Sequence, residues 1–168
     1  LDQFKADDLV GLREFSTNVG PPEHDTYIDL VPVGPVSSQR EQLVTQIDGL
    51  FPTNGTPLYD VTQASMKTML DTYDPTRINA VVILTDGEDT SSRRTLGTLR
   101  AQLAGQARSE GTVVRVYTIA YGEQANRGDL ASVAAASGGK GFEGDPKDIE
   151  AVYTSISVPS PPSRAASS

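Results

Sequence analysis

The sequence predicts an α/β fold in which a mostly parallel sheet carries helices on both faces. Apolar segments alternate along the chain with amphipathic ones, which is the order that produces strands joined by crossover helices. The stretch AVVIL at 80–84 is apolar without interruption, as is typical of a strand covered on both sides. Pro32, in the segment 27–33, lacks an amide donor and therefore indicates an edge strand. We expect a doubly wound sheet with that strand antiparallel at one edge.

Strands are predicted where β-branched and apolar residues cluster between turn residues. In chain order these segments are 9–15, 27–33, 80–84, 112–122 and a short one at 139–144. The glycine-rich SGGKG at 137–141 lacks the strand before it and the helix after it that a phosphate loop requires. It is predicted to be the turn into the last strand.

Helices are predicted where apolar residues recur three and four positions apart. Ser37 or Ser38 can cap the first, in which Leu43, Val44, Ile47 and Leu50 form one apolar stripe. Pro57 opens the second, because proline is favoured in a first turn. The remaining helices are expected at 94–108, 129–137 and 146–157.

The amino-acid composition and net charge exclude several classes of function. The 168 residues fit one domain, with 21% charged and 37% hydrophobic residues, as in a folded globular protein. The net charge of -8 argues against a nucleic-acid partner, and no apolar run is long enough for direct membrane insertion. Without cysteine there is no disulfide or thiol chemistry, and the single histidine, His24, cannot build a histidine-based zinc site.

Two loops carry oxygen ligands that suit a hard metal ion. Asp86 lies two positions after the end of the strand at 80–84, and in a parallel sheet ligands bind where strands reach their carboxyl ends. Thr56, in NGTPLYD at 54–60, presents a hydroxyl just before a helix. A hydroxyl and a carboxylate at one sheet edge are hard oxygen ligands that suit Mg²⁺, Mn²⁺ or Ca²⁺.

At these residues the sequence resembles a known family. NGTPLYD and AVVILTDGED, about 25 residues apart, are similar to the second and third metal motifs of the von Willebrand factor A domain. The resemblance assigns residues 1–158 to such a domain and leaves 159–168 as a Pro/Ser-rich disordered tail. It implies a Rossmann-like sheet and an adhesion site whose metal ion is completed by a carboxylate of a protein partner. Thr56 matches the threonine ligand, and Asp86 matches the last aspartate, which acts through water. An extracellular or cell-envelope setting is also implied.

The family's first motif, Asp-x-Ser-x-Ser, is missing. Its nearest match, DTSSR at 89–93, has Arg93 where the second serine belongs, so Ser91 or Ser92 is interpreted as a helix cap. We therefore expect a domain that lacks its first strand and helix and binds metal weakly or not at all. The strands at 9–15 and 80–84 should then lie a strand's width apart or pair directly.

Other interpretations remain open. Asp86 can serve as a turn-forming Asp-Gly, and Thr56 can cap the helix behind it. RGD at 127–129 is predicted to open a helix with Asp129 as its cap rather than to bind an integrin. Three function classes follow: a non-enzymatic adhesion module, an intracellular assembly partner of an ATPase- or chelatase-type complex, and a Mg²⁺-dependent phosphatase. The phosphatase would use the Asp86-Gly87-Glu88 spacing but has no supporting lysine.

Overall fold

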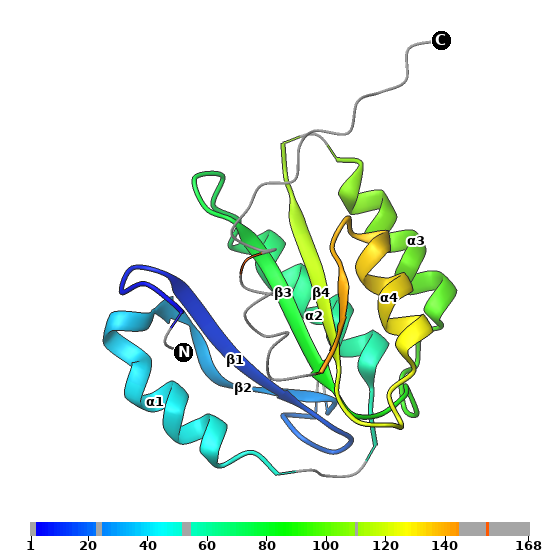
Figure 1. Ribbon diagram of the computed structural model, residues 1–168, viewed down its shortest axis with the longest axis horizontal. Coiled ribbons are helices and arrows are strands. Elements are labelled where there is room, and N and C mark those ends of the chain that lie inside the picture. The colour runs from blue at the N-terminus through cyan, green and yellow to red at the C-terminus, as the bar shows by residue number, and fades with distance from the viewer. Residues whose placement is uncertain (1–2, 23–24, 52–54, 110, 145–153, 155–168) are drawn as a thin grey trace.

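The computed structural model describes residues 3–22, 25–51, 55–109 and 111–144, together with Thr154. It is an α/β structure with a parallel three-stranded sheet flanked by helices, plus an antiparallel hairpin (Figure 1). The strands are β1 (Leu9–Phe15), β2 (Tyr27–Pro35), β3 (Asn79–Thr85), β4 (Val114–Ala120) and β5 (Gly141–Glu143). The helices are α1 (Val36–Asp48), α2 (Leu58–Asp71), α3 (Leu96–Ala107) and α4 (Arg127–Ala136). The predicted fold class is confirmed.

The parallel sheet has the order β3-β4-β5, and its main core lies on one face. Alternate residues of β3, Val81 and Ile83, point to this face and are buried together with Val116 of β4. The helices α2, α3 and α4 cover it, and α3 contributes the fully buried Leu99 and Leu103. These helices therefore bury their apolar residues against the parallel sheet, as the periodic spacing of those residues predicts.

The opposite face of the same sheet is also apolar. Tyr117 and Ile119 of β4 are buried there and pack against Phe142, whereas Val82 and Leu84 of β3 are exposed. The predicted last helix at 146–157 lies outside the described residues except for Thr154, and the predicted tail at 159–168 lies wholly outside them. Among the described helices, none combines the length and hydropathy that crossing a bilayer requires.

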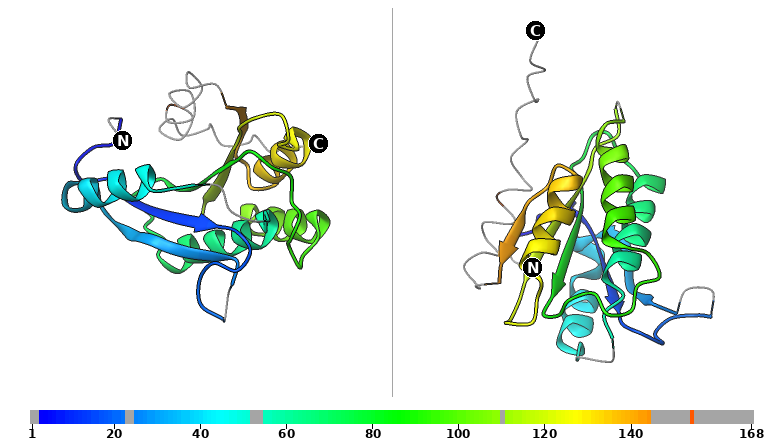
Figure 2. Two further views of the ribbon diagram at one scale, coloured as in Figure 1. Left: turned by 90° about the horizontal axis from the view of Figure 1, so that it is seen from below. Right: turned by 90° about the vertical axis from the view of Figure 1, so that its right-hand side faces the viewer.

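The hairpin β1–β2 forms a separate sheet, with β2 antiparallel as predicted. Figure 2 shows α1 and α2 on opposite sides of it. Arg13 of β1 connects it to α2. Its guanidinium stacks on Tyr27 at 4.0 Å, pairs with both carboxylate oxygens of Asp29 at 2.6 and 3.0 Å, and donates to Ser65 and Thr68 of α2 at 3.2 Å each. Side chains thus hold the hairpin to the rest of the molecule.

Within the described residues, β1 and β3 do not pair directly. The arrangement in which these two strands pair directly is therefore excluded, and each keeps one edge without a strand partner in the described part of the chain.

The apolar stripe predicted for α1 is only partly buried. Leu43 is buried, but Val44, Ile47 and Leu50 are exposed. A stripe typical of a core-facing helix is thus only partly covered by the described part of the chain.

Candidate functional site

Thr56 and Asp86 lie on adjacent loops at the carboxyl end of β3. The Thr56 amide donates to Thr90 Oγ1 at 2.9 Å, and the Thr90 amide donates to the Thr56 carbonyl at 3.1 Å. A Cβ added to Gly87 would lie 3.3 Å from Thr56 Oγ1, so the threonine hydroxyl is beside the residue that follows Asp86. The structure therefore brings the two predicted ligand loops together.

Asp86 is an exposed carboxylate on a fixed backbone. The carbonyl of Thr85 accepts a hydrogen bond from Tyr121 at 2.8 Å, and the Gly87 amide donates to Thr85 Oγ1 at 3.3 Å. Gly122, at φ 82°, passes close to the Asp86 side chain: its Cβ would lie 3.7 Å from Asp86 Cβ. The turn is thus fixed by Thr85, and the Asp86 carboxylate is not needed for it.

The two predicted ligand groups, the Thr56 hydroxyl and the Asp86 carboxylate, have no partner in the described part of the chain. Among the described residues, none makes a hydrogen bond or ion pair with Thr56 Oγ1 or with the Asp86 carboxylate. By contrast, Asp89 accepts from Ser92, and Asp60 pairs with Arg94.

The donor set suits a hard cation in type but not in number. Thr56 and Asp86 offer a hydroxyl and a carboxylate, which are ligands that Mg²⁺ and Mn²⁺ accept. The described residues contain no group of three acidic, histidine or cysteine side chains that could hold a metal ion. These two residues can therefore supply part of a coordination shell, and the rest must come from water or from groups outside the described residues.

The start of α2 is capped from another loop. Ser92 Oγ accepts from the amides of Tyr59 at 2.9 Å and Asp60 at 3.1 Å, and Asp89 accepts from the Tyr59 amide at 3.3 Å. The N-cap residue of α2 is Pro57, and it makes no side-chain cap. Thr56 is therefore not the cap of this helix, which answers one of the alternative interpretations.

The prediction that Ser91 or Ser92 caps a helix at that point of the chain was wrong, because Ser92 caps α2 and not the helix that follows it. The cap of α3 is Thr95, whose side chain accepts from the Thr98 amide at 3.2 Å. Asp60 receives the Arg93 amide at 2.8 Å and Arg94 Nε at 2.9 Å. These contacts hold the segment after Asp86 against the first turn of α2.

The Arg-Gly-Asp stretch opens α4, but Asp129 is not its cap. Asn126 caps the helix, accepting from the Asp129 amide at 3.1 Å, so the predicted cap was wrong by three residues. Asp129 is instead in the first turn and accepts a 2.9 Å hydrogen bond from the Tyr59 hydroxyl. The carboxylate that integrin recognition would need is thus already bonded within the molecule.

Tyr59 joins α2 to α4 and is 8% exposed. Burial raises its pKa above the ordinary value of 10.0, and the Asp129 hydrogen bond with the charges of Asp129, Asp89 and Glu88 raises it further. The folded state therefore keeps the proton to higher pH than the unfolded state does. The resulting stabilisation is present below about pH 10 and is lost as pH rises beyond it.

We expect Tyr59→Phe to lower the free energy of unfolding by about 1–2 kcal/mol at pH 7, because it removes a hydrogen bond to a carboxylate. Above pH 10 the difference from the unsubstituted protein should shrink. Urea unfolding at pH 7 and pH 10.5 measures both effects. Tyr121→Phe, at an exposed tyrosine, is the matched control. A difference for Tyr59→Phe that does not change with pH would contradict the assignment.

Comparison with solved structures shows which known fold the chain has. The chain superposes on proximal thread matrix protein 1 from the mussel byssus with a TM-score of 0.62 and 16% identity, over 92% of this chain and 38% of that one. It superposes on the conserved hypothetical protein BatB from Bacteroides thetaiotaomicron with a TM-score of 0.66 and 15% identity, over 93% of this chain and 80% of that one. Both are von Willebrand factor A domain proteins. The chain has a von Willebrand factor A-like fold. Comparison of the sequence with known protein families gives no match, and neither does comparison with curated proteins.

In this von Willebrand factor A-like fold, the sequence predicted where Thr56 and Asp86 lie, but it did not predict the side chains that hold their loops in place. Thr90 fixes the Thr56 backbone, and the Ser92–Asp89 pair fixes the start of α2. A signal was present, because the stretch 89–92 is entirely polar and begins three residues after Asp86. Its partner helix lies some thirty residues earlier, as the Ser92 to Asp60 separation of 32 shows, so the contact is not visible as local spacing.

Proposed function

We propose that this chain is a non-enzymatic protein-binding module in which a divalent metal ion at Thr56 and Asp86 bridges to a carboxylate of a protein partner. The observation that carries the proposal is that these two adjacent oxygen donors are free of other described partners, whereas the neighbouring aspartates are engaged. The von Willebrand factor A-like fold supports it as well.

The residues around the site favour a metal-dependent contact. Asp86 and Glu88 are exposed, and the whole chain carries a net charge of -8, so a partner's carboxylate meets repulsion unless a cation intervenes. Bound Mg²⁺ or Mn²⁺ supplies the positive charge for that carboxylate. Thr56, held through its backbone by Thr90, offers its hydroxyl from one side, and Asp86 offers its carboxylate from the end of β3.

Paramagnetic broadening by Mn²⁺ tests the site in the chain as it stands. Substoichiometric Mn²⁺ should broaden the amide resonances of Thr56 and Gly87 most strongly, and Asp86→Ala should remove the effect. Acetate, as a carboxylate probe, should shift the same resonances only when Mg²⁺ is present. Glu88→Gln is the matched control, since Glu88 is an exposed acid two residues away. Broadening that survives Asp86→Ala would contradict the assignment.

Phosphatase chemistry finds less support. It would need a lysine near the Asp86–Glu88 pair. Of the lysines in the described part of the chain, Lys5 precedes β1 and its amide bonds to Asp8, Lys67 pairs with Asp71 on α2, and Lys140 precedes β5 at the opposite edge of the parallel sheet. We expect no hydrolysis of a generic phosphate ester. Mg²⁺-dependent hydrolysis that Asp86→Ala abolishes would replace the binding proposal with the enzymatic one.

A further inference from the structure

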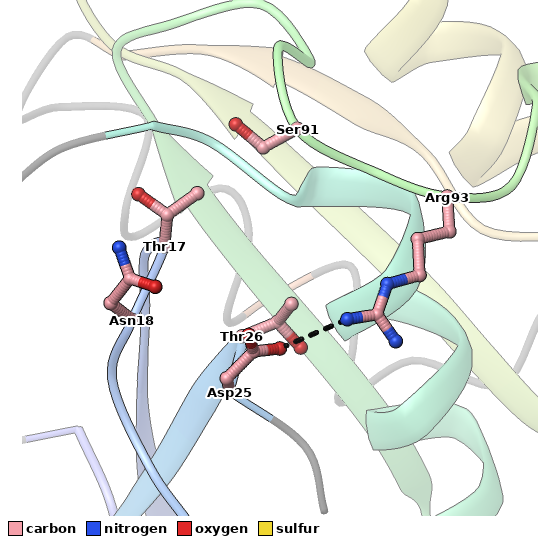
Figure 3. A pocket seen from close by; sticks show the side chains of 6 residues that line it. All are labelled: Thr17, Asn18, Asp25, Thr26, Ser91 and Arg93. Carbon is pink, nitrogen blue, oxygen red and sulfur yellow. Dashed lines mark hydrogen bonds and ion pairs between the residues drawn. The ribbon is translucent and has the colours of Figure 1, made fainter. Parts of the chain in front are cut away.

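A polar cavity of about 340 Å³ opens beside the loop that carries Thr56 (Figure 3). Gly55, at φ 72°, lies against two of the residues that line it, because a Cβ there would lie 2.6 Å from Thr17 Cγ2 and 2.7 Å from Ser91 Oγ. The lining residues come from the β1–β2 connection and the β3–α3 loop. They are Thr17, Asn18, Asp25, Thr26, Ser91 and Arg93. Two residues of the cavity lining, Thr17 and Ser91, are thus in contact with the glycine that precedes Thr56.

Two of the lining residues are charged, and they hold each other weakly. Arg93 reaches across the cavity to Asp25 with one contact of 3.4 Å (Figure 3). The side chains are 82% and 44% exposed, and such a surface pair contributes about 0–1 kcal/mol. The Arg93 amide is held by Asp60 at 2.8 Å, so the guanidinium can leave Asp25 without moving the loop. An incoming ion can therefore replace one member of the pair at little cost.

The negative charge around the cavity determines which member of the Arg93–Asp25 pair an incoming ion replaces. The exposed acids Asp86 and Glu88 lie on the same β3–α3 loop, and the chain as a whole is acidic, so a cation is attracted and an anion repelled. The oxygens of Thr26 and Asn18 can accept hydrogen bonds from a guanidinium or ammonium group. We propose that the cavity accepts a basic side chain of the protein partner, with Asp25 as its counter-ion and Arg93 displaced into solvent. This inference rests on the proposed binding function and adds a second contact to the partner's carboxylate.

An NMR titration with N-acetyl-L-argininamide, in EDTA and without added metal, tests the cavity alone. The amides of Thr26 and Ser91 should shift and saturate in the millimolar range. Asp25→Asn should weaken binding about fivefold, the equivalent of about 1 kcal/mol. Arg93→Gln should strengthen it, because it removes the competing cation. Asp48→Asn and Arg108→Gln change the net charge equally at exposed positions outside the cavity and should have little effect.

Three results would overturn the inference: no shift with argininamide, an unchanged affinity in Asp25→Asn, or a shift with the α-amide of N-acetyl-L-aspartic acid that Arg93→Gln abolishes. The last would show a cavity that binds acidic groups through Arg93. Because no metal is present, each of these leaves the Mn²⁺ test of Thr56 and Asp86 unaffected. A negative Mn²⁺ test would likewise leave the cavity result standing.

Discussion

Calorimetry should show very weak Mg²⁺ or Mn²⁺ binding by this chain, and binding tighter by about two orders of magnitude or more when a strand and helix carrying Asp-x-Ser-x-Ser are added before Leu1. The addition supplies one further carboxylate and two hydroxyls to Thr56 and Asp86. Two protein oxygens leave a hard ion with most of its water, whereas five can displace much of it. Among the described residues, β1 and β3 each keep one edge without a strand partner, to which an added strand can form backbone hydrogen bonds.

Variants of the extended chain separate the ligands from the added charge. Thr56→Val and Asp86→Ala should each return the affinity towards that of the shorter chain. Glu88→Gln should change it little, although it also removes a negative charge from the same loop. Equal and tight binding by both chain lengths would show that Thr56 and Asp86 are not the ligands.

Gly139→Ala should lower the free energy of unfolding by about 3 kcal/mol, at the upper end of what overpacking costs. A Cβ at this position would lie 2.0 Å from the Val116 carbonyl oxygen and 2.9 Å from its carbonyl carbon. Neither neighbour is a side chain that can rotate away. The turn is bound to β4 on both sides of the clash, since Ser137 Oγ accepts from the Val116 amide at 2.8 Å and the Lys140 carbonyl accepts from Thr118 at 3.2 Å.

Gly105→Ala is the matched control for this substitution. Gly105 lies within α3, and a Cβ there meets nothing within 4 Å. The same change of residue should therefore stabilise the protein by about 0.5–1 kcal/mol through helix propensity. Chemical denaturation of both variants measures the two effects. A cost below 1 kcal/mol for Gly139→Ala would mean that the turn does not lie against β4 as described.

Sequence reasoning predicted the strands and helices well where the pattern depends on burial. The run at 80–84 became β3, and the leucines of α3 became core, because uninterrupted or periodic apolar residues can be satisfied in few ways. It did less well for α1. The stripe of Leu43, Val44 and Ile47 is periodic, but the cover that would bury all of it is not among the described residues. Periodicity shows which face is apolar and not what packs against it.

The candidate site shows the same division. The placement of Thr56 and Asp86 at the carboxyl end of β3 could be predicted because a strand end and a helix start fix where each lies along the chain. Their mutual position depends on Thr90, and the start of α2 depends on Ser92 thirty-two residues later than Asp60. Such long-range caps have no local signature, because a serine in a polar loop is compatible with many partners. The error at Asp129 is different, because the actual cap, Asn126, lies only three residues earlier; what has no local signature there is the hydrogen bond from Tyr59 to Asp129 across 70 residues.

The side-chain connection between the hairpin and the parallel sheet has a mechanical consequence. Arg13 with Ser65 and Thr68 makes one attachment, Phe15 in the core a second, and Arg77 with the Asp7 carbonyl at 2.8 Å a third. A backbone ladder loaded along its strands must break many hydrogen bonds together, whereas these attachments can fail one at a time. Tension applied across the two sheets would therefore separate them along this seam before either sheet lost its own strand pairing.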